Sequence, residues 1–177
     1  MSNKFQQATP QGQKHTVSDI WLTPEWIINS IGISDLDPCG WKPNGSPIVE
    51  TAKNYYTEDE NGLNKDWYKY TSVFCNPPYS DLKNWLKNWL KKCHETHSIY
   101  GTNIIVLCFV RSETQAFQNN IKGCTGINLI SKRIKFLNYL GEEKGNGNAP
   151  SCLIAWGGDA YKRIRNVKGL YFKKDYQ

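Results

Sequence analysis

The chain has 177 residues, which fits one compact domain and is too short for a catalytic domain joined to a large separate recognition domain. Lys and Arg number 22 against 16 Asp and Glu, and the resulting net charge of +6 favours a polyanionic partner over an acidic protein or a neutral metabolite. Hydrophobic residues make up 39% of the chain, so its composition from about residue 18 onward excludes a disordered protein.

The cysteines and the apolar runs argue against metal, disulfide and membrane roles. The six cysteines show no paired CxxC spacing with a nearby His, and four of them lie in or at the end of apolar runs. We interpret Cys39, Cys75, Cys108 and Cys152 as reduced core thiols and expect no bound metal. No apolar run approaches the roughly 18 to 20 residues of a membrane span, and residues 1–15 lack an apolar signal core. We therefore expect a cytoplasmic monomer without membrane contact.

The N-terminal part of the chain predicts a loose lead-in, a helix and a short strand. Residues 1–17 are polar and lack a hydrophobic period, so we expect a flexible lead-in before one domain over residues 18–177. Thr23 and Pro24 are typical of a helix start, as N-cap and first helical residue, and Gly32 ends that helix. Residues 36–40 then indicate a buried strand running into a tight turn, a common ligand-binding place in α/β sheets.

From residue 72 onward, strands and helices alternate. The pattern predicts, in chain order, a strand at 72–75, an amphipathic helix at 82–95, a central strand at 103–110, a helix at 111–121, one or two strands within 127–140, a Gly- and Asn-rich loop at 141–150 and a strand at 151–156. Residues 48–70 are too irregular to assign. Alternation of this kind predicts an α/β sheet covered by helices.

The tetrapeptide Asn76-Pro77-Pro78-Tyr79 ends the strand at 72–75, because two successive prolines supply no amide donors. An amino nitrogen conjugated to a heteroaromatic ring is a poor nucleophile, and acceptors for both of its hydrogens direct its lone pair toward a methyl donor. The Asn76 side-chain oxygen and the Pro77 carbonyl can accept those hydrogens, and the Tyr79 ring offers a stacking surface for a planar base. A rigid loop without a catalytic role is the alternative interpretation.

The same tetrapeptide resembles the catalytic motif of amino-methyltransferases, and the wider chain resembles the phage DNA N-6-adenine methyltransferase family of Dam-type enzymes. The resemblance spans about residues 21–157. The segments that carry it are, in chain order, Trp21-x-Thr23-Pro24, Leu36-Asp37-Pro38-Cys39, Gly62-Leu63 with Trp67, Phe74 through Ser80, Arg133-Ile134-Lys135-Phe136, and Pro150-Ser151.

This resemblance implies a single-domain, Rossmann-like methyltransferase sheet with helices on both faces and S-adenosylmethionine as the cofactor. The residues expected to bind the cofactor are Trp21, Thr23, Pro24, Asp37, Pro38, Cys39 and Asp59. The expected catalytic residues are Asn76, Pro77, Pro78 and Tyr79, and the expected substrate contacts are Tyr79, Ser80, Arg111, Arg133 and Phe136. A carboxylate such as Asp37 at a strand end can pair with the ammonium group of the cofactor's methionine moiety.

The chain departs from the family pattern in two places. Residues 41–44 read WKPN where further glycines are usual after the first cofactor loop. Asn61 stands where an acidic residue often precedes Gly-Leu, which leaves Asp59 or Glu60 to hydrogen-bond the cofactor's adenine or ribose. The sequence leaves the choice between the two open, and we name Asp59 as the residue expected to contact the cofactor.

Several candidate substrate contacts have structural alternatives. Arg111 and Arg133 can meet phosphates or instead cap helices and form ion pairs, and Phe136 can pack on a base or in the core. The basic stretch from Lys162 to Lys174 is either a phosphate-contacting patch or a solvated terminus.

Together these features predict a site-specific DNA adenine N6-methyltransferase that acts on an adenine flipped out of double-stranded DNA, in the host cytoplasm if the protein is phage-encoded. The same tetrapeptide serves enzymes that methylate RNA adenines or protein glutamines, and cytosine is a further candidate base. An inactive nucleic-acid-binding module with a methyltransferase fold is the alternative from a different class.

Overall fold

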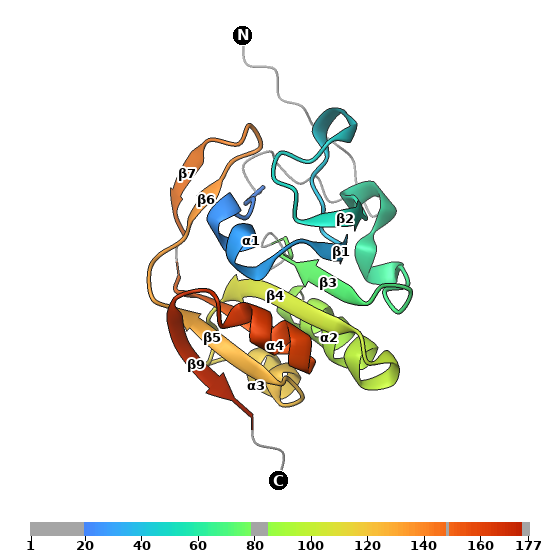
Figure 1. The fold of residues 1–177 in the computed structure, drawn as a ribbon, viewed down its shortest axis with the longest axis vertical. Coiled ribbons are helices and arrows are strands. Elements are labelled where there is room, and N and C mark those ends of the chain that lie inside the picture. Colours follow the sequence, from blue (N-terminus) through green and yellow to red (C-terminus); the bar gives the residue numbers. More distant parts are fainter. Residues whose placement is uncertain (1–19, 79–84, 148, 175–177) are drawn as a thin grey trace.

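The computed structural model describes residues 20–78, 85–147 and 149–174, with the side chains of residues 85, 86 and 146 left out. The predicted lead-in over residues 1–17 and the predicted site residues Tyr79 and Ser80 lie outside the described residues. A seven-stranded sheet forms the centre of the molecule, and a two-stranded hairpin stands beside it (Figure 1).

The main sheet has the strand order β2-β1-β3-β4-β8-β5-β9. Its strands are β1 (Ser34–Asp37), β2 (Ala52–Tyr55), β3 (Ser72–Cys75), β4 (Asn103–Phe109), β5 (Gly126–Ile130), β8 (Ser151–Trp156) and β9 (Gly169–Lys173). The hairpin consists of β6 (Lys135–Leu137) and β7 (Glu143–Asn146). The α-helices are α1 (Glu25–Ile31), α2 (Trp85–Tyr100), α3 (Gln115–Ile121) and α4 (Gly158–Ile164), with short 3-10 turns η2 (Pro43–Gly45), η3 (Glu58–Glu60) and η4 (Gly62–Asn64).

Five strands of the main sheet run in one direction and two run in the other. β1 pairs in parallel with β2 and β3, and β3 pairs in parallel with β4. β8 lies antiparallel between β4 and β5, and β9 pairs antiparallel with β5 at the sheet's edge. The carboxyl ends of β1, β3 and β4 therefore meet at one side of the molecule, where ligand sites form in open α/β sheets.

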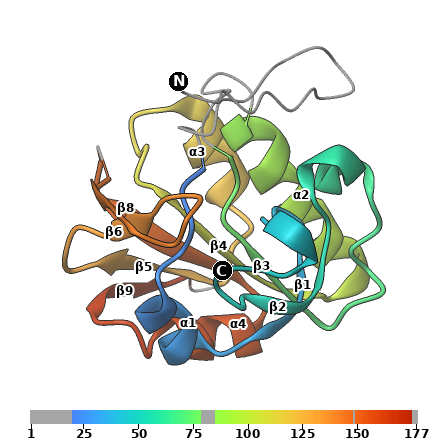
Figure 2. The same ribbon diagram turned by 90° about the horizontal axis from the view of Figure 1, so that it is seen from above.

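Helices cover both faces of this sheet. Figure 2 shows α2 and α3 on one face and α1 and α4 on the other. The central strands are buried on both faces: every residue of β8 is buried, as are residues 104–109 of β4. Such strands appear in the sequence as unbroken apolar runs, which is why both were predictable. The predicted α/β sheet with helices on both faces is confirmed.

Some predicted boundaries were wrong. The N-cap of α1 is Pro24, with no side-chain cap bond, whereas Thr23 was predicted to cap the helix. The Thr23 hydroxyl instead accepts a hydrogen bond from the Asn76 side chain. Helix α2 continues past the predicted end to Tyr100. The predicted loop at 141–150 contains β7, which its Gly and Asn residues did not indicate because the strand depends on pairing with β6.

Arg163 of α4 joins that helix to the start of the sheet. Its Nε donates to the Ile31 carbonyl at 2.5 Å, and its Nη2 donates to the Gly32 carbonyl at 2.7 Å and to Ser34 Oγ at 3.1 Å. One guanidinium thereby satisfies acceptors at the end of α1 and at the beginning of β1. Arg163 therefore stabilises the contact between α4 and the start of the sheet, and it does not belong to the basic surface predicted for this part of the chain.

We expect Arg163→Met to lower the free energy of unfolding by about 2 to 3 kcal/mol, because three acceptors lose a charged donor. Arg165→Met is the matched control, since Arg165 is an exposed residue just after the same helix, and it should change stability by less than about 0.5 kcal/mol. Urea unfolding at a constant m-value measures both. Equal losses in the two variants would contradict the bracing role.

Candidate active site

Asn76 follows β3 at the side of the molecule where the parallel strands end, and the segment before α1 holds its side chain. Asn76 Nδ2 donates to the Trp21 carbonyl oxygen at 2.7 Å and to Thr23 Oγ1 at 3.2 Å. Two oxygen acceptors at one end of the carboxamide identify that end as the nitrogen. Trp21 and Thr23 therefore determine where the Asn76 oxygen lies.

The segment from Trp21 to Thr23 is anchored on the hairpin. Leu22 and Leu137 of β6 exchange two backbone hydrogen bonds, of 2.9 and 3.0 Å. The Trp21 ring meets Phe136 edge-on, with 5.7 Å between centroids, and Lys144 Nζ of β7 lies 4.1 Å from the Trp21 ring centroid. The orientation of Asn76 thus depends on packing between residues that are far apart in the sequence.

Asp37 ends β1, and its carboxylate organises the loop that follows. Oδ1 accepts the Cys39 backbone N–H at 2.9 Å, and Oδ2 accepts the Thr51 hydroxyl at 2.5 Å. The side chain is buried, and the loss of hydration raises its pKa to about 6, although both hydrogen bonds act in the opposite direction. The group is therefore close to its titration point near neutral pH.

The Asp37 loop lies against the end of β3. Cys39 Sγ and Cys75 Sγ are 3.4 Å apart, and Asn76 follows Cys75 directly. Burial raises the pKa of the Cys39 thiol to about 11 and that of the Cys75 thiol well above its ordinary value, so both stay protonated. All six cysteines are free thiols. The contact brings the predicted cofactor loop and the predicted catalytic loop together at one site.

The acidic turn η3 lies beside the same loop. Gly62 packs so closely on Pro38 that a Cβ at this position would overlap the Pro38 carbonyl oxygen. Both acids predicted for the cofactor are exposed, but Glu60 accepts the backbone N–H of Thr57 at 2.8 Å in a capping box. The Glu60 side chain therefore stabilises its own turn.

The other predicted site residues vary in exposure. Pro77 is buried and Pro78 is exposed, while Tyr79 and Ser80 lie outside the described residues. Arg111, just after β4, is 4.0 Å from Glu113, and the exposed Arg133 donates to the Gly147 carbonyl at 3.3 Å. Phe136 is fully buried between Trp21 and Phe109.

These positions bear differently on the predicted roles. The buried Phe136 ring packs against the Trp21 ring. A contact between Phe136 and a base stays a prediction. Arg111 and Arg133 lie near the ends of the strands that carry the site, since Gly147 packs against Phe109 at the end of β4. Sequence reasoning missed Thr51, whose hydroxyl reaches Asp37 only because β2 folds alongside β1.

The raised pKa of Asp37 makes protein stability depend on pH. The native carboxyl binds its proton more tightly than the unfolded one, whose pKa is near 3.8, so the native state carries more protons between about pH 4 and pH 6. The free energy of unfolding should therefore fall as pH rises through that window, by up to about 3 kcal/mol relative to Asp37→Asn. Urea titrations of both proteins at several pH values measure the difference. Parallel pH profiles would contradict this account.

The described residues contain neither a metal-binding cluster nor a helix suited to span a membrane. Across residues 20–78, 85–147 and 149–174, no group of three or more His, Cys, Asp or Glu side chains is placed to hold a metal ion. None of the helices in that part of the chain combines the length and the hydropathy needed to cross a bilayer.

Comparison with known proteins identifies the family of this chain. A family model described as DNA N-6-adenine-methyltransferase (Dam) matches residues 11–168. The chain is also 29% identical over 154 residues to a DNA N-6-adenine-methyltransferase of Haemophilus phage HP1, and the match covers 82% of this chain and 83% of that protein. Because the family match takes in most of the chain, including the site around Asn76, this chain belongs to the DNA N-6-adenine-methyltransferase (Dam) family.

Proposed function

We propose that this protein transfers a methyl group from S-adenosylmethionine to the N6 amino group of an adenine that is flipped out of double-stranded DNA. The observation that carries the proposal is the orientation of the Asn76 carboxamide, whose nitrogen donates to Trp21 and Thr23. That arrangement presents the carboxamide oxygen as a hydrogen-bond acceptor at a defined position.

The chemistry of an aromatic amine explains why such an acceptor is useful. The lone pair of the adenine N6 nitrogen is delocalised into the ring, so the nitrogen attacks poorly. The Asn76 oxygen accepts one amino hydrogen and the Pro77 carbonyl accepts the other, which favours a lone pair directed at the methyl group. Both acceptors sit on a rigid loop and need no reorganisation during the reaction. Tyr79 supplies the ring on which the base stacks.

The residues around Asp37 fit the proposed cofactor, which supplies an electrophilic methyl group when bound. The Asp37 carboxylate can pair with an ammonium group, because each of its oxygens retains a lone pair beyond the bonds to Cys39 and Thr51. Trp41 Nε1 in the same loop is a buried donor that finds no acceptor among the described residues, so a bound ligand can satisfy it. Asp59, on the turn beside this loop, remains the candidate contact for the cofactor's adenine or ribose.

DNA is proposed to approach along the side of the molecule formed by the hairpin and the end of β4. Arg111 and the exposed Arg133 lie near this site and can contact the phosphates that flank the flipped base. The turn that joins β6 and β7 also exposes Tyr139 and Leu140, at 40% and 61%. Aromatic and aliphatic side chains at such a tip are suited to contact bases beside an opened pair.

We expect Asn76→Ala to reduce kcat on duplex DNA by about a hundredfold or more, because the acceptor for the amino group is lost. The affinity for S-adenosylmethionine, measured by calorimetry, should stay within about threefold of the wild-type value. Asn64→Ala, at an exposed position, is the matched control and should retain wild-type turnover. Wild-type turnover by Asn76→Ala would rule out the proposed mechanism. If the wild-type protein fails to bind S-adenosylmethionine, the result would instead favour an inactive DNA-binding module.

Thr23 tests whether the orientation of Asn76 matters. Thr23→Val keeps the shape of the side chain and removes the hydroxyl that accepts from Asn76, so kcat should fall about tenfold. Thr23→Ser retains the hydroxyl and should retain most of the activity. The readout is kcat together with the dissociation constant for S-adenosylmethionine. A weaker cofactor affinity at unchanged kcat would mean that Thr23 contacts the cofactor and does not position Asn76.

A further inference from the structure

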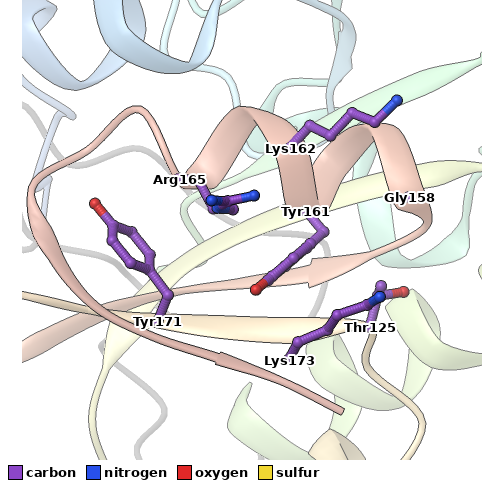
Figure 3. Close-up of a pocket in the computed structure, with 7 residues that line it drawn as sticks. All are labelled: Thr125, Gly158, Tyr161, Lys162, Arg165, Tyr171 and Lys173. Atoms are coloured by element: carbon purple, nitrogen blue, oxygen red, sulfur yellow. The ribbon is translucent and has the colours of Figure 1, made fainter. Parts of the chain in front are cut away.

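A pocket of about 490 Å³ lies between α4 and the strands β5 and β9. Figure 3 shows the residues that line it: Thr125, Gly158, Tyr161, Lys162, Arg165, Tyr171 and Lys173. Thr125 directly precedes β5 and Gly158 follows the end of β8, so the pocket lies at the side where β5 begins. Asn76 and Asp37 lie at the opposite side, where the parallel strands end. The pocket is therefore separate from the candidate active site.

The pocket is positively charged. Its lining carries Lys162, Arg165 and Lys173 and no carboxylate, and none of these three cations forms an ion pair with another described residue. Asp159, the acid nearest in sequence to Lys162 and Arg165, acts on Arg163, four residues further along α4. Asp175, two residues after Lys173, lies outside the described residues. Among the described residues, the three cations are thus available to an anionic ligand, and Tyr161 and Thr125 line the same pocket.

Packing holds the walls of the pocket in place. The Tyr161 ring lies directly on Gly126 of β5, where a Cβ would overlap it. The Tyr171 hydroxyl donates to the Val167 carbonyl at 2.7 Å. Asn128 of β5 donates to the Ile164 and Val167 carbonyls, which fixes the connection from α4 to β9. The cations accordingly extend from a preformed surface and not from a loose terminus.

The chemistry of the pocket and of β9 selects the ligand. In Figure 3 the charged ends of Lys162, Arg165 and Lys173 point to separate places, which suits a row of phosphates better than one phosphate group. β9 is an edge strand, and Lys173 and Lys174 at its end oppose pairing with the same strand of a second copy. A polyanion is favoured by the same charges.

We propose that this pocket binds backbone phosphates of DNA, at a second site that holds a DNA segment other than the one carrying the target adenine. The proposal rests on the proposed action of the protein on DNA, but it concerns binding and is tested by binding. A second site at the opposite ends of the parallel strands keeps the enzyme bound to DNA while the active site releases one DNA segment and binds another.

The test compares two triple variants of equal charge by fluorescence anisotropy on a duplex of G·C pairs alone, which contains no target base. Lys162→Gln/Arg165→Gln/Lys173→Gln neutralises the pocket, and Lys69→Gln/Lys91→Gln/Lys122→Gln removes the same charge from exposed positions elsewhere. The pocket variant should bind about tenfold more weakly at low salt, and its salt slope should fall by about 2 to 3, near 0.9 for each lost phosphate contact. The control variant should change little, and both should keep the wild-type melting temperature.

Stoichiometry supplies a second measurement. Titrated with a short target-bearing duplex, the wild-type and control proteins should each bind two duplexes, and the pocket variant should bind one. One duplex for all three proteins, or equal weakening in both triple variants, would overturn the second site. Displacement of duplex from the pocket by millimolar inorganic phosphate would assign it to a small anion instead. Failure of wild-type protein to bind any duplex would count against the proposed function itself.

Discussion

The structure of the candidate site depends on the hydrogen bonds that orient the Asn76 carboxamide. An amide side chain offers a donor end and an acceptor end that are nearly identical in shape, so its chemical use is decided by its neighbours. Here a backbone carbonyl and a threonine hydroxyl accept from the nitrogen, and the oxygen faces the other way. Without these two acceptors the loop of two prolines would be equally rigid, yet it would present no defined acceptor to an amino group.

That orientation is produced by parts of the chain that meet only in the folded protein. Leu22 pairs with the hairpin at Leu137, Phe136 supports the Trp21 ring, and the contact between Cys75 and Cys39 joins the end of β3 to the Asp37 loop. The parallel strands bring these loops to one side, as in other open α/β sheets. The hairpin therefore supports the orientation of Asn76, the residue proposed to accept the amino group of the target base.

The sequence predicted the fold best where burial leaves a continuous pattern. The strands at 72–75 and 151–156 are buried and were placed correctly, whereas the edge strands β2 and β9 were not, because their exposed faces interrupt the apolar run. At the site, the tetrapeptide that begins with Asn76 was recognisable from its proline pair. The hydrogen-bond partners of Asn76 and Asp37 were not recognisable in the sequence, because Thr23 and Thr51 reach them through pairings between distant segments. Thr23 was even assigned to the helix cap, the usual role of a threonine before a helix.

The reaction proposed for the site around Asn76 is methylation of the amino group of adenine in DNA. The most direct test incubates the protein with labelled S-adenosylmethionine and, separately, with duplex DNA, RNA and a protein fraction, and then identifies the labelled nucleoside or amino acid. The proposed reaction predicts label in N6-methyl-2′-deoxyadenosine from duplex DNA, and no such label when Asn76 is replaced by alanine. Label in methylated cytosine, in RNA adenine or in protein glutamine, with none in DNA adenine, would contradict it.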